Sequence, residues 1–95
     1  MKKNLFNFIN IGVWNIQGLF TKVNYLKLNK LEDPEIFKRI TSFELLCIQE
    51  TQCTTKDAQS SQVPGYLVYA FHRKISKNNR YFGGSAILIK KELKE

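Results

Sequence analysis

The hydrophobic and polar residues of the chain are arranged in short stretches that are typical of β-strands. Residues 8–14 have a period of two, which places Ile9, Ile11 and Val13 on one face of a predicted strand. Residues 43–49 form an almost continuous apolar run, and such runs are typical of strands that are buried on both faces. The first half of the chain therefore contains two predicted strands.

Two further strands are predicted in the second half of the chain. The turn signal Pro64-Gly65 precedes an aromatic and apolar stretch at residues 66–71. A period of two returns at residues 85–90, after a pair of glycines. The intervening residues 72–79 are basic and contain two asparagines, which is typical of a hairpin loop. We therefore expect these two strands to form a β-hairpin.

One helix is predicted between the first two strands. Asp33 can cap free backbone N–H groups, Pro34 suits the first helical position, and Glu35 complements the helix dipole. An apolar stripe then extends the predicted helix to about residue 41, and it consists of Ile36, Phe37 and Ile40. The order strand, helix, strand implies a right-handed crossover and two parallel strands.

Two other segments carry weaker patterns. Residues 21–31 are mixed, with a weak helical face made of Val23, Leu26 and Leu31. Residues 51–62 are polar and predict a loop.

The composition excludes several classes of protein. A length of 95 residues allows one small domain, and two cysteines are too few for a disulfide-dense secreted scaffold. With 43% hydrophobic and 13% aromatic residues, disorder does not describe the whole chain. No apolar run approaches the roughly 20 residues of a membrane helix, so we expect no membrane association.

The cysteines and the N-terminal residues predict an intracellular protein. Neither Cys47 nor Cys53 belongs to a zinc-binding pattern, and both are expected to stay reduced, as in the nucleus or the cytoplasm. The first ten residues only faintly resemble a secretory signal, because asparagines interrupt the apolar stretch and no small-residue cleavage site follows. We therefore expect that the chain is not secreted.

The charge of the chain favours a polyanionic partner. Lys and Arg number 15 against 8 Asp and Glu, and the resulting net charge of +7 suits nucleic acid. A charge that only keeps the chain soluble explains the excess equally well. Within the predicted hairpin loop and just beyond it, the candidates for gripping a nucleic-acid backbone are Arg73, Lys74 and Arg80. A solvated basic loop is an equally good interpretation of these residues.

Polar residues stand where the first two predicted strands end. Asn15 ends the first strand and Glu50 ends the second, and parallel strands joined by a crossover end at the same edge of their sheet. A carboxylate at that edge suits Mg²⁺, and an amide can orient a phosphate oxygen. Gln17 adds a further donor nearby. On pattern alone, side chains that merely end strands in solvent are the commoner case.

Four short motifs follow one another along the chain. They are WNIQGL at residues 14–19, LLCIQET at 45–51, PGY at 64–66 and RYFGGSAILI at 80–89. Their types and order resemble the endonuclease/exonuclease/phosphatase superfamily, which includes DNase I and the exonuclease III-type apurinic endonucleases. The residues GLFTK at 18–22 and QET at 49–51 are similar to those of the apurinic-type endonuclease domains of LINE-like non-LTR retrotransposons.

The resemblance implies an α+β fold in which residues 1–95 are the N-terminal part of a four-layer α/β/β/α sandwich. It also implies cleavage of nucleic acid, expected to be DNA, by a water activated with Mg²⁺ or Mn²⁺. Glu50 matches the metal-binding glutamate, Asn15 the active-site asparagine, and Gln17 a polar position near the phosphate. Glu44 stands where an aspartate is commoner.

The later motifs of the superfamily do not occur in this chain. They are a tyrosine, an Asp-x-Asn pair, a further aspartate and a closing Ser-Asp-His, which supply the general base and the remaining ligands. Asp33 and Asp57 lie in other contexts, and His72 matches none of these motifs. We therefore expect a C-terminal half of the domain elsewhere, weak metal binding, and no catalysis by the isolated chain. A non-catalytic nucleic-acid-binding fragment and a truncated product without function are the alternatives.

Overall fold

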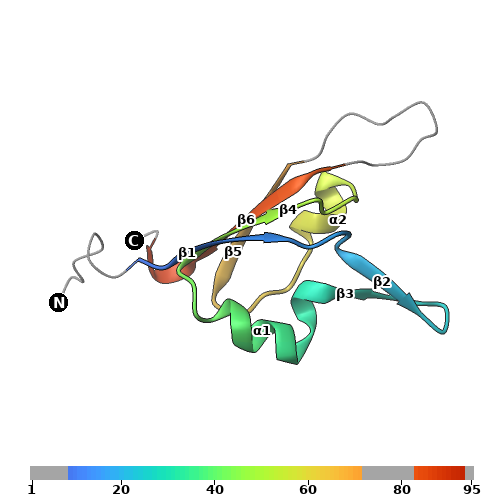
Figure 1. The fold of residues 1–95 in the computed structure, drawn as a ribbon, viewed down its shortest axis with the longest axis horizontal. Helices are drawn as coiled ribbons and strands as arrows, with labels where there is room; N and C mark the ends of the chain where they lie inside the picture. Colours follow the sequence, from blue (N-terminus) through green and yellow to red (C-terminus); the bar gives the residue numbers. More distant parts are fainter. Residues whose placement is uncertain (1–8, 72–82, 94–95) are drawn as a thin grey trace.

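Four strands of the chain form one mixed sheet (Figure 1). The computed structural model describes residues 9–71 and 83–93, and its main sheet contains β1 (Ile11–Asn15), β4 (Leu45–Gln49), β5 (Tyr66–Phe71) and β6 (Ser85–Lys90). The strands lie in the order β1-β4-β6-β5. β1 runs parallel to β4, whereas β6 is antiparallel to both of its neighbours, so the sheet is mixed.

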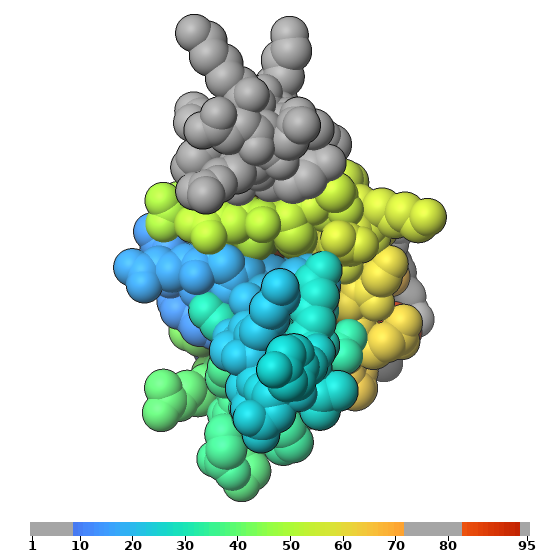
Figure 2. All heavy atoms as spheres, turned by 90° about the vertical axis from the view of Figure 1, so that its right-hand side faces the viewer, coloured from blue at the N-terminus to red at the C-terminus, as the bar shows by residue number. Residues whose placement is uncertain are grey.

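A second, smaller sheet and short helices complete the described fold. β2 (Phe20–Val23) and β3 (Leu26–Asn29) form an antiparallel hairpin that projects past the end of β1 (Figure 1 and Figure 2). The helical segments are α1 (Pro34–Ile40), α2 (Thr55–Gln59), η1 (Lys30–Glu32) and η2 (Lys91–Leu93). Within residues 9–71 and 83–93, no helix has the length and apolar character needed to cross a bilayer.

The predicted strands and their directions are largely confirmed. The strands at residues 66–71 and 85–90 have the predicted bounds and are hydrogen-bonded neighbours. The first strand, predicted at residues 8–14, occupies Ile11–Asn15. β1 and β4 are parallel, as the intervening helix requires.

The predicted helix is confirmed as α1, whereas α2 lies in a segment for which we expected a loop. Asp33 Oδ1 accepts hydrogen bonds from the backbone N–H groups of Glu35 at 2.8 Å and Ile36 at 3.4 Å. At α2, Thr54 Oγ1 accepts a hydrogen bond from the N–H of Asp57 at 3.0 Å. Each helix therefore begins at a side-chain cap, but only the first cap is followed by a long apolar stripe that is visible in the sequence.

The weak helical face expected at residues 21–31 is wrong, because this segment forms the β2–β3 hairpin. Asn24 and Tyr25 join the two strands, and both have left-handed backbones, with φ of 49° and 70°. Two left-handed residues in succession form the type I′ turn that matches the twist of a hairpin. The hairpin loop predicted at residues 72–79 lies outside the described residues.

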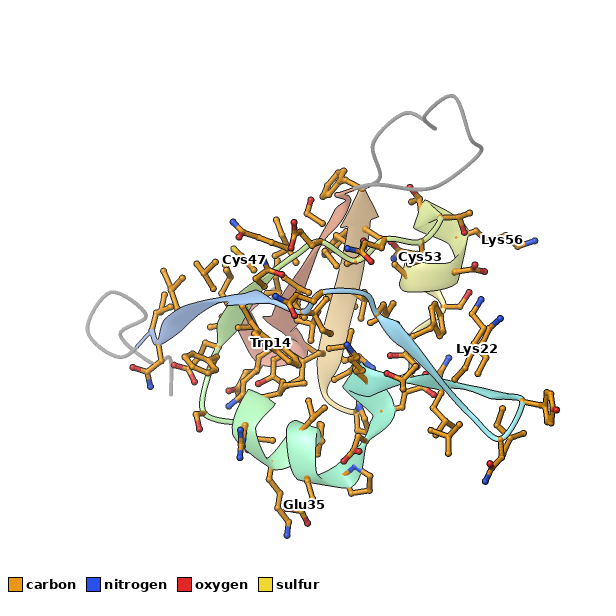
Figure 3. The ribbon with its side chains drawn as sticks, turned by 45° about the vertical axis from the view of Figure 1, so that its right-hand side comes forward. Trp14, Lys22, Glu35, Cys47, Cys53 and Lys56 are labelled. Carbon is orange, nitrogen blue, oxygen red and sulfur yellow. The ribbon has the colours of Figure 1, made fainter. Side chains whose placement is uncertain are left out.

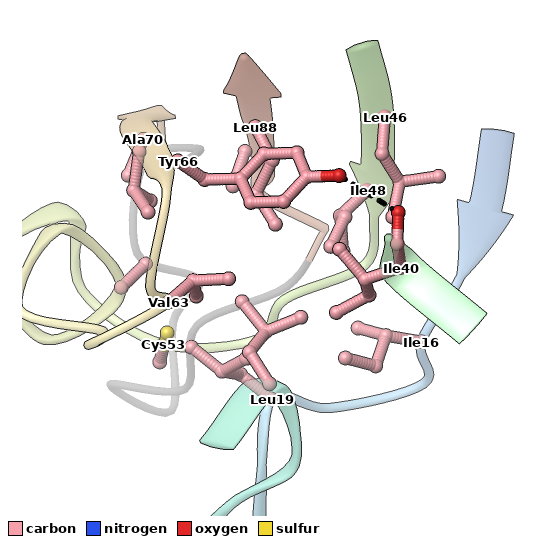
Figure 4. Close-up of a cluster of buried hydrophobic side chains, with 14 residues drawn as sticks. Ile16, Leu19, Ile40, Leu46, Ile48, Cys53, Val63, Tyr66, Ala70 and Leu88 are labelled. Carbon is pink, nitrogen blue, oxygen red and sulfur yellow. Dashed lines mark hydrogen bonds between the residues drawn. The ribbon is translucent and has the colours of Figure 1, made fainter. Parts of the chain in front are cut away.

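Only one face of the main sheet is buried, which corrects the expectation that β4 is buried on both faces. On the inner face, Leu46 and Ile48 are buried, whereas Cys47 on the opposite face is half-buried. Figure 3 shows Trp14 and Cys47 on opposite sides of the sheet. The remaining core side chains come from α1, the loops and the neighbouring strands (Figure 4).

Tyr66 joins the sheet to α1 at the centre of this core. Its hydroxyl group contacts the carbonyl oxygen of Ile40 at 2.9 Å and also that of Phe43 (Figure 4 shows the contact with Ile40). Burial raises the pKa of the Tyr66 hydroxyl, and the charges of Glu44 and Glu92 raise it further. The tyrosine therefore stays protonated and holds the C-terminal end of α1 against β5.

The opposite side of the main sheet, which we call the open face, carries two rows of mainly apolar side chains and a third row that is polar except for Phe71. The strand register aligns its side chains in three rows, which are Ile11–Leu45–Ile89–Leu67, Val13–Cys47–Ile87–Tyr69 and Asn15–Gln49–Ser85–Phe71. Ile11, Val13 and Phe71 are 63%, 65% and 57% exposed. Among the described residues, Leu93 of η2 borders a hollow on the part of the face formed by β5 and β6. The two apolar rows of the open face therefore have the composition of a core but not its burial.

Candidate functional site

The carboxyl ends of β1 and β4 lie side by side, and they carry the two residues that the sequence singled out. Asn15 is in register with Gln49, so Glu50 follows one position beyond the paired strands. The backbone N–H of Ile16 donates to the Gln49 carbonyl at 3.0 Å, and that of Gly18 donates to the Glu50 carbonyl at 2.8 Å. The backbones of Asn15 and Glu50 are therefore held at adjacent positions on one edge of the sheet.

The backbone at this edge has an unusual concentration of left-handed residues. Of the five non-glycine residues with positive φ in the described part of the chain, three are here, namely Gln17 (51°), Glu50 (58°) and Gln52 (52°). Gly83 and Gly84 have φ of 67° and 80° and belong to the same edge, because their carbonyl oxygens accept hydrogen bonds from Gln52 (2.8 Å) and Thr51 (3.3 Å). Non-glycine residues pay a steric cost for this conformation, and such residues cluster at functional sites.

Internal hydrogen bonds orient the Asn15 amide and hold the loop that follows it. Asn15 Oδ1 accepts a hydrogen bond from the N–H of Gln17 at 3.1 Å. Because the oxygen faces the chain's own backbone, the Asn15 NH₂ group is left as the donor of this side chain. Lys30 Nζ donates to the carbonyl oxygens of Ile16 at 2.9 Å and Gln17 at 3.4 Å, and this brings a positive charge to the base of the loop.

The three predicted site residues differ in exposure. Asn15 and Gln17 are exposed, and Glu50 is half-buried. The Glu50 carboxylate forms no ion pair or hydrogen bond with another described residue. The edge therefore presents one half-buried carboxylate and two amides to solvent.

These groups suit a hard cation but supply few ligands for it. Oxygen ligands are those that Mg²⁺ and Mn²⁺ prefer, and Mg²⁺ usually keeps several waters beside one or two carboxylates. Among the described residues, no three acidic, histidine or cysteine side chains come together as a metal site. The donor type therefore fits a divalent cation, with Glu50 as the single carboxylate.

Behind this edge, Thr51 and Cys53 are buried. Thr51 is 1% exposed, and its hydroxyl oxygen forms no well-aligned hydrogen bond within the described part of the chain. Burial raises the pKa of the Cys53 thiol, an effect that the nearby Thr51 hydroxyl opposes. The thiol is therefore held protonated, which makes a role as nucleophile or metal ligand unfavourable.

Some predicted site residues lie outside the described part of the chain, and the structure shows other features of the site that were not predicted. Arg73, Lys74 and Arg80 lie outside the described residues, as does His72. Lys30 was missed, because nothing in the sequence marks a lysine that reaches back to a loop before the hairpin. The hairpin itself was missed, although the asparagine at residue 24 is a turn signal that points to it.

The chain was also compared with known proteins. Neither the protein-family models, nor the curated proteins, nor the solved structures contain a match to it.

Proposed function

We propose that the chain forms the N-terminal part of a metal-dependent phosphodiesterase that cleaves the nucleic-acid backbone, with DNA as the substrate. The observation that carries this proposal is the meeting of Asn15 and Glu50 at adjacent carboxyl ends of two parallel strands. Ligands bind preferentially at such edges. The left-handed residues at the same edge and the net charge of +7 support it.

Each side chain has a distinct role in the proposed site. Glu50 would hold Mg²⁺ or Mn²⁺, and a bound cation supplies charge stabilisation for the phosphate oxygens. The Asn15 NH₂ group would donate to a phosphate oxygen, because its Oδ1 is already engaged by the Gln17 N–H. Lys30 lies at the base of the loop and favours an anion there. The general base would come from residues outside the described part.

We further propose that the open face is where the second sheet of a four-layer α/β/β/α sandwich packs. The inner face of the main sheet packs against α1, whereas the open face carries two apolar rows that cross all four strands. Two sheets that pack face to face lie about 10 Å apart and interdigitate such side chains. The partly exposed rows of the open face support this arrangement.

Titration with Mn²⁺ tests the metal site directly. We expect Mn²⁺ to broaden the amide NMR signals of residues 15–18 and 50–52, because a paramagnetic ion on Glu50 lies near both loops. The variant Glu50→Gln is expected to weaken this binding at least about tenfold, since it removes the charge that holds the ion. Glu35→Gln on α1, which removes an exposed carboxylate far from the site, is the matched control. Equal broadening in wild type and Glu50→Gln would contradict a metal site at Glu50.

A plasmid assay separates metal binding from catalysis. We expect the 95-residue chain to leave supercoiled plasmid intact in Mg²⁺, because one carboxylate without a general base does not complete the site. Conversion to the nicked form is measured on an agarose gel, with EDTA and Glu50→Ala as controls. Nicking that both controls abolish would show that this chain alone contains a complete active site.

A further inference from the structure

The β2–β3 hairpin continues directly from the candidate site. β2 starts at Phe20, immediately after the loop that contains Gln17 and Gly18, and Lys30 joins the end of β3 back to that loop. Four residues at about 3.3 Å each carry the turn roughly 13 Å past the edge of the sheet. Figure 1 shows this projection from the side, and in Figure 2 the hairpin points toward the viewer. A long ligand at the site therefore has the hairpin beside it.

The turn of the hairpin holds a residue that is unfavourable there for the stability of the chain. Type I′ turns favour glycine at the second central position, because that residue must have a positive φ. Tyr25 occupies this position with φ of 70°, and its side chain is fully exposed. The tyrosine therefore has the steric cost of a left-handed backbone without the compensation of burial.

The strands of the hairpin carry a second unfavourable feature. Lys22 and Lys27 are direct cross-strand partners, and like charges in this position destabilise a hairpin. Lys27 is partly compensated, because its Nζ lies 3.8 Å from Asp57 Oδ2 and 4.3 Å from the centre of the Phe20 ring. Lys22 has no ion-pair partner among the described residues.

The hairpin contacts α2, which carries a further exposed lysine. The Lys27–Asp57 ion pair joins β3 to this helix, and the exposed Lys56 precedes Asp57 on it. Figure 3 shows Lys22 and Lys56 extending from the same side of the molecule. An aromatic tip and two lysines thus lie on one arm that starts at the candidate site, and Lys56 lies on the neighbouring helix.

We propose that this hairpin is an arm that binds the substrate polynucleotide on one side of the cleaved phosphate. Lys22 and Lys27 contact backbone phosphates, and the Tyr25 ring stacks on an unpaired base. At roughly 13 Å from the edge of the sheet, the tyrosine acts a few nucleotides from the cleaved bond. The two features that destabilise the free hairpin, an exposed left-handed tyrosine and facing lysines, are both compensated by this ligand. The proposal rests on the proposed function in its choice of nucleic acid as the substrate.

Salt-dependent binding tests the contribution of the lysines. The probe is a fluorescein-labelled single-stranded DNA oligonucleotide, and its fluorescence anisotropy is measured with the full chain in EDTA over a series of salt concentrations. Lys22→Gln is expected to make the negative slope of log K against log salt shallower by about 0.7, which corresponds to the loss of one phosphate contact on a single strand. Lys91→Gln removes the same charge from η2, at the opposite end of the molecule, and is expected to leave the slope unchanged. Equal effects of the two variants would overturn the proposal.

Substitution of the tyrosine tests the stacking. Tyr25→Gly creates the favoured Asn-Gly turn, so the melting temperature is expected to rise while the affinity for the oligonucleotide falls about tenfold. Tyr25→Phe keeps the ring and is expected to bind as tightly as wild type. If Tyr25→Gly binds the oligonucleotide as tightly as wild type, stacking by Tyr25 is overturned.

The proposed metal site at Glu50 and the proposed role of the hairpin are contradicted by different experimental results. Oligonucleotide binding is measured in EDTA and therefore does not involve the cation. In a chain that also carries Glu50→Gln, Lys22→Gln and Tyr25→Gly are expected to change oligonucleotide binding as they do in the wild-type chain. If the wild-type chain binds no oligonucleotide at low salt, the role of the hairpin is overturned, whereas Mn²⁺ binding at Glu50 is decided separately.

Discussion

Replacing Ile48 by alanine is expected to lower the free energy of unfolding by about 2 to 5 kcal/mol. Ile48 is completely buried on β4, which lies between β1 and β6 in the main sheet. The truncation removes apolar contacts and leaves a cavity that neighbours on several strands do not close. Since single domains are stable by roughly 5 to 15 kcal/mol, with small ones at the lower end, much of the variant is expected to be unfolded.

Urea unfolding followed by circular dichroism measures this effect. The matched control is Val13→Ala on β1, which shortens a β-branched residue that is 65% exposed on the open face. Its cost is expected to stay within about 0.5 kcal/mol, because it loses little burial. Equal losses in both variants would contradict the assignment of the inner face as the core of the chain.

The isolated chain is also expected to associate with itself through the open face. Four strands spaced at about 4.8 Å and three rows spaced at about 6.6 Å give a face of roughly 400 Å² in projection, of which two rows and Phe71 are apolar. Apolar patches of a few hundred Å² are often functional on soluble proteins. At about 25 cal/mol per Å², burial of one such face contributes on the order of 10 kcal/mol before the cost of association is subtracted. The net result is a weak complex that forms at high protein concentration.

A double variant tests this prediction without disturbing the core. Val13→Thr with Phe71→Thr places hydroxyl groups on two exposed positions of the open face, and threonine is β-branched and therefore favourable in strands. We expect the sedimentation coefficient to fall to that of an 11.1 kDa monomer and the fluorescence of the dye ANS to drop several-fold. Val23→Thr with Leu28→Thr makes the same kind of change on the hairpin. If this control lowers association as much, the hairpin and not the open face is the associating surface.

Local sequence patterns were sufficient to predict most strands, one helix and the direction of the first strand pair. The cap at Asp33 and the period of two in residues 85–90 depend only on neighbours in the sequence, so they can be read without a fold. The same holds for Asn15 and Glu50 at one edge of the sheet, because parallel strands joined by a crossover end at the same edge, whereas the observed register shows that the two strands are direct neighbours. Their chemical roles stay predictions.

Structural features that depend on residues distant in the sequence were predicted less accurately. The apolar run at residues 43–49 has the same composition whether one face or two faces of the strand are covered, and the register with β6 shows Cys47 on the open face. Residues 21–31 carry too few apolar positions to distinguish a helix from a hairpin that is held at its base by Lys30. Gly12 illustrates the same point, because a Cβ there would lie 2.6 Å from Phe43 Cε1, a contact between separate elements.

The sequence by itself therefore determined four of the six described strands, where α1 is capped, and that an amide and a carboxylate end strands at the same edge of a sheet. Only the tertiary structure decided that Gln17, Glu50 and Gln52 share left-handed backbones at one edge, and that Tyr25 stands fully exposed on an arm beside them. The physical reason is that caps and periodicity arise within a few residues, whereas burial and backbone strain depend on which distant segments hydrogen-bond and pack together.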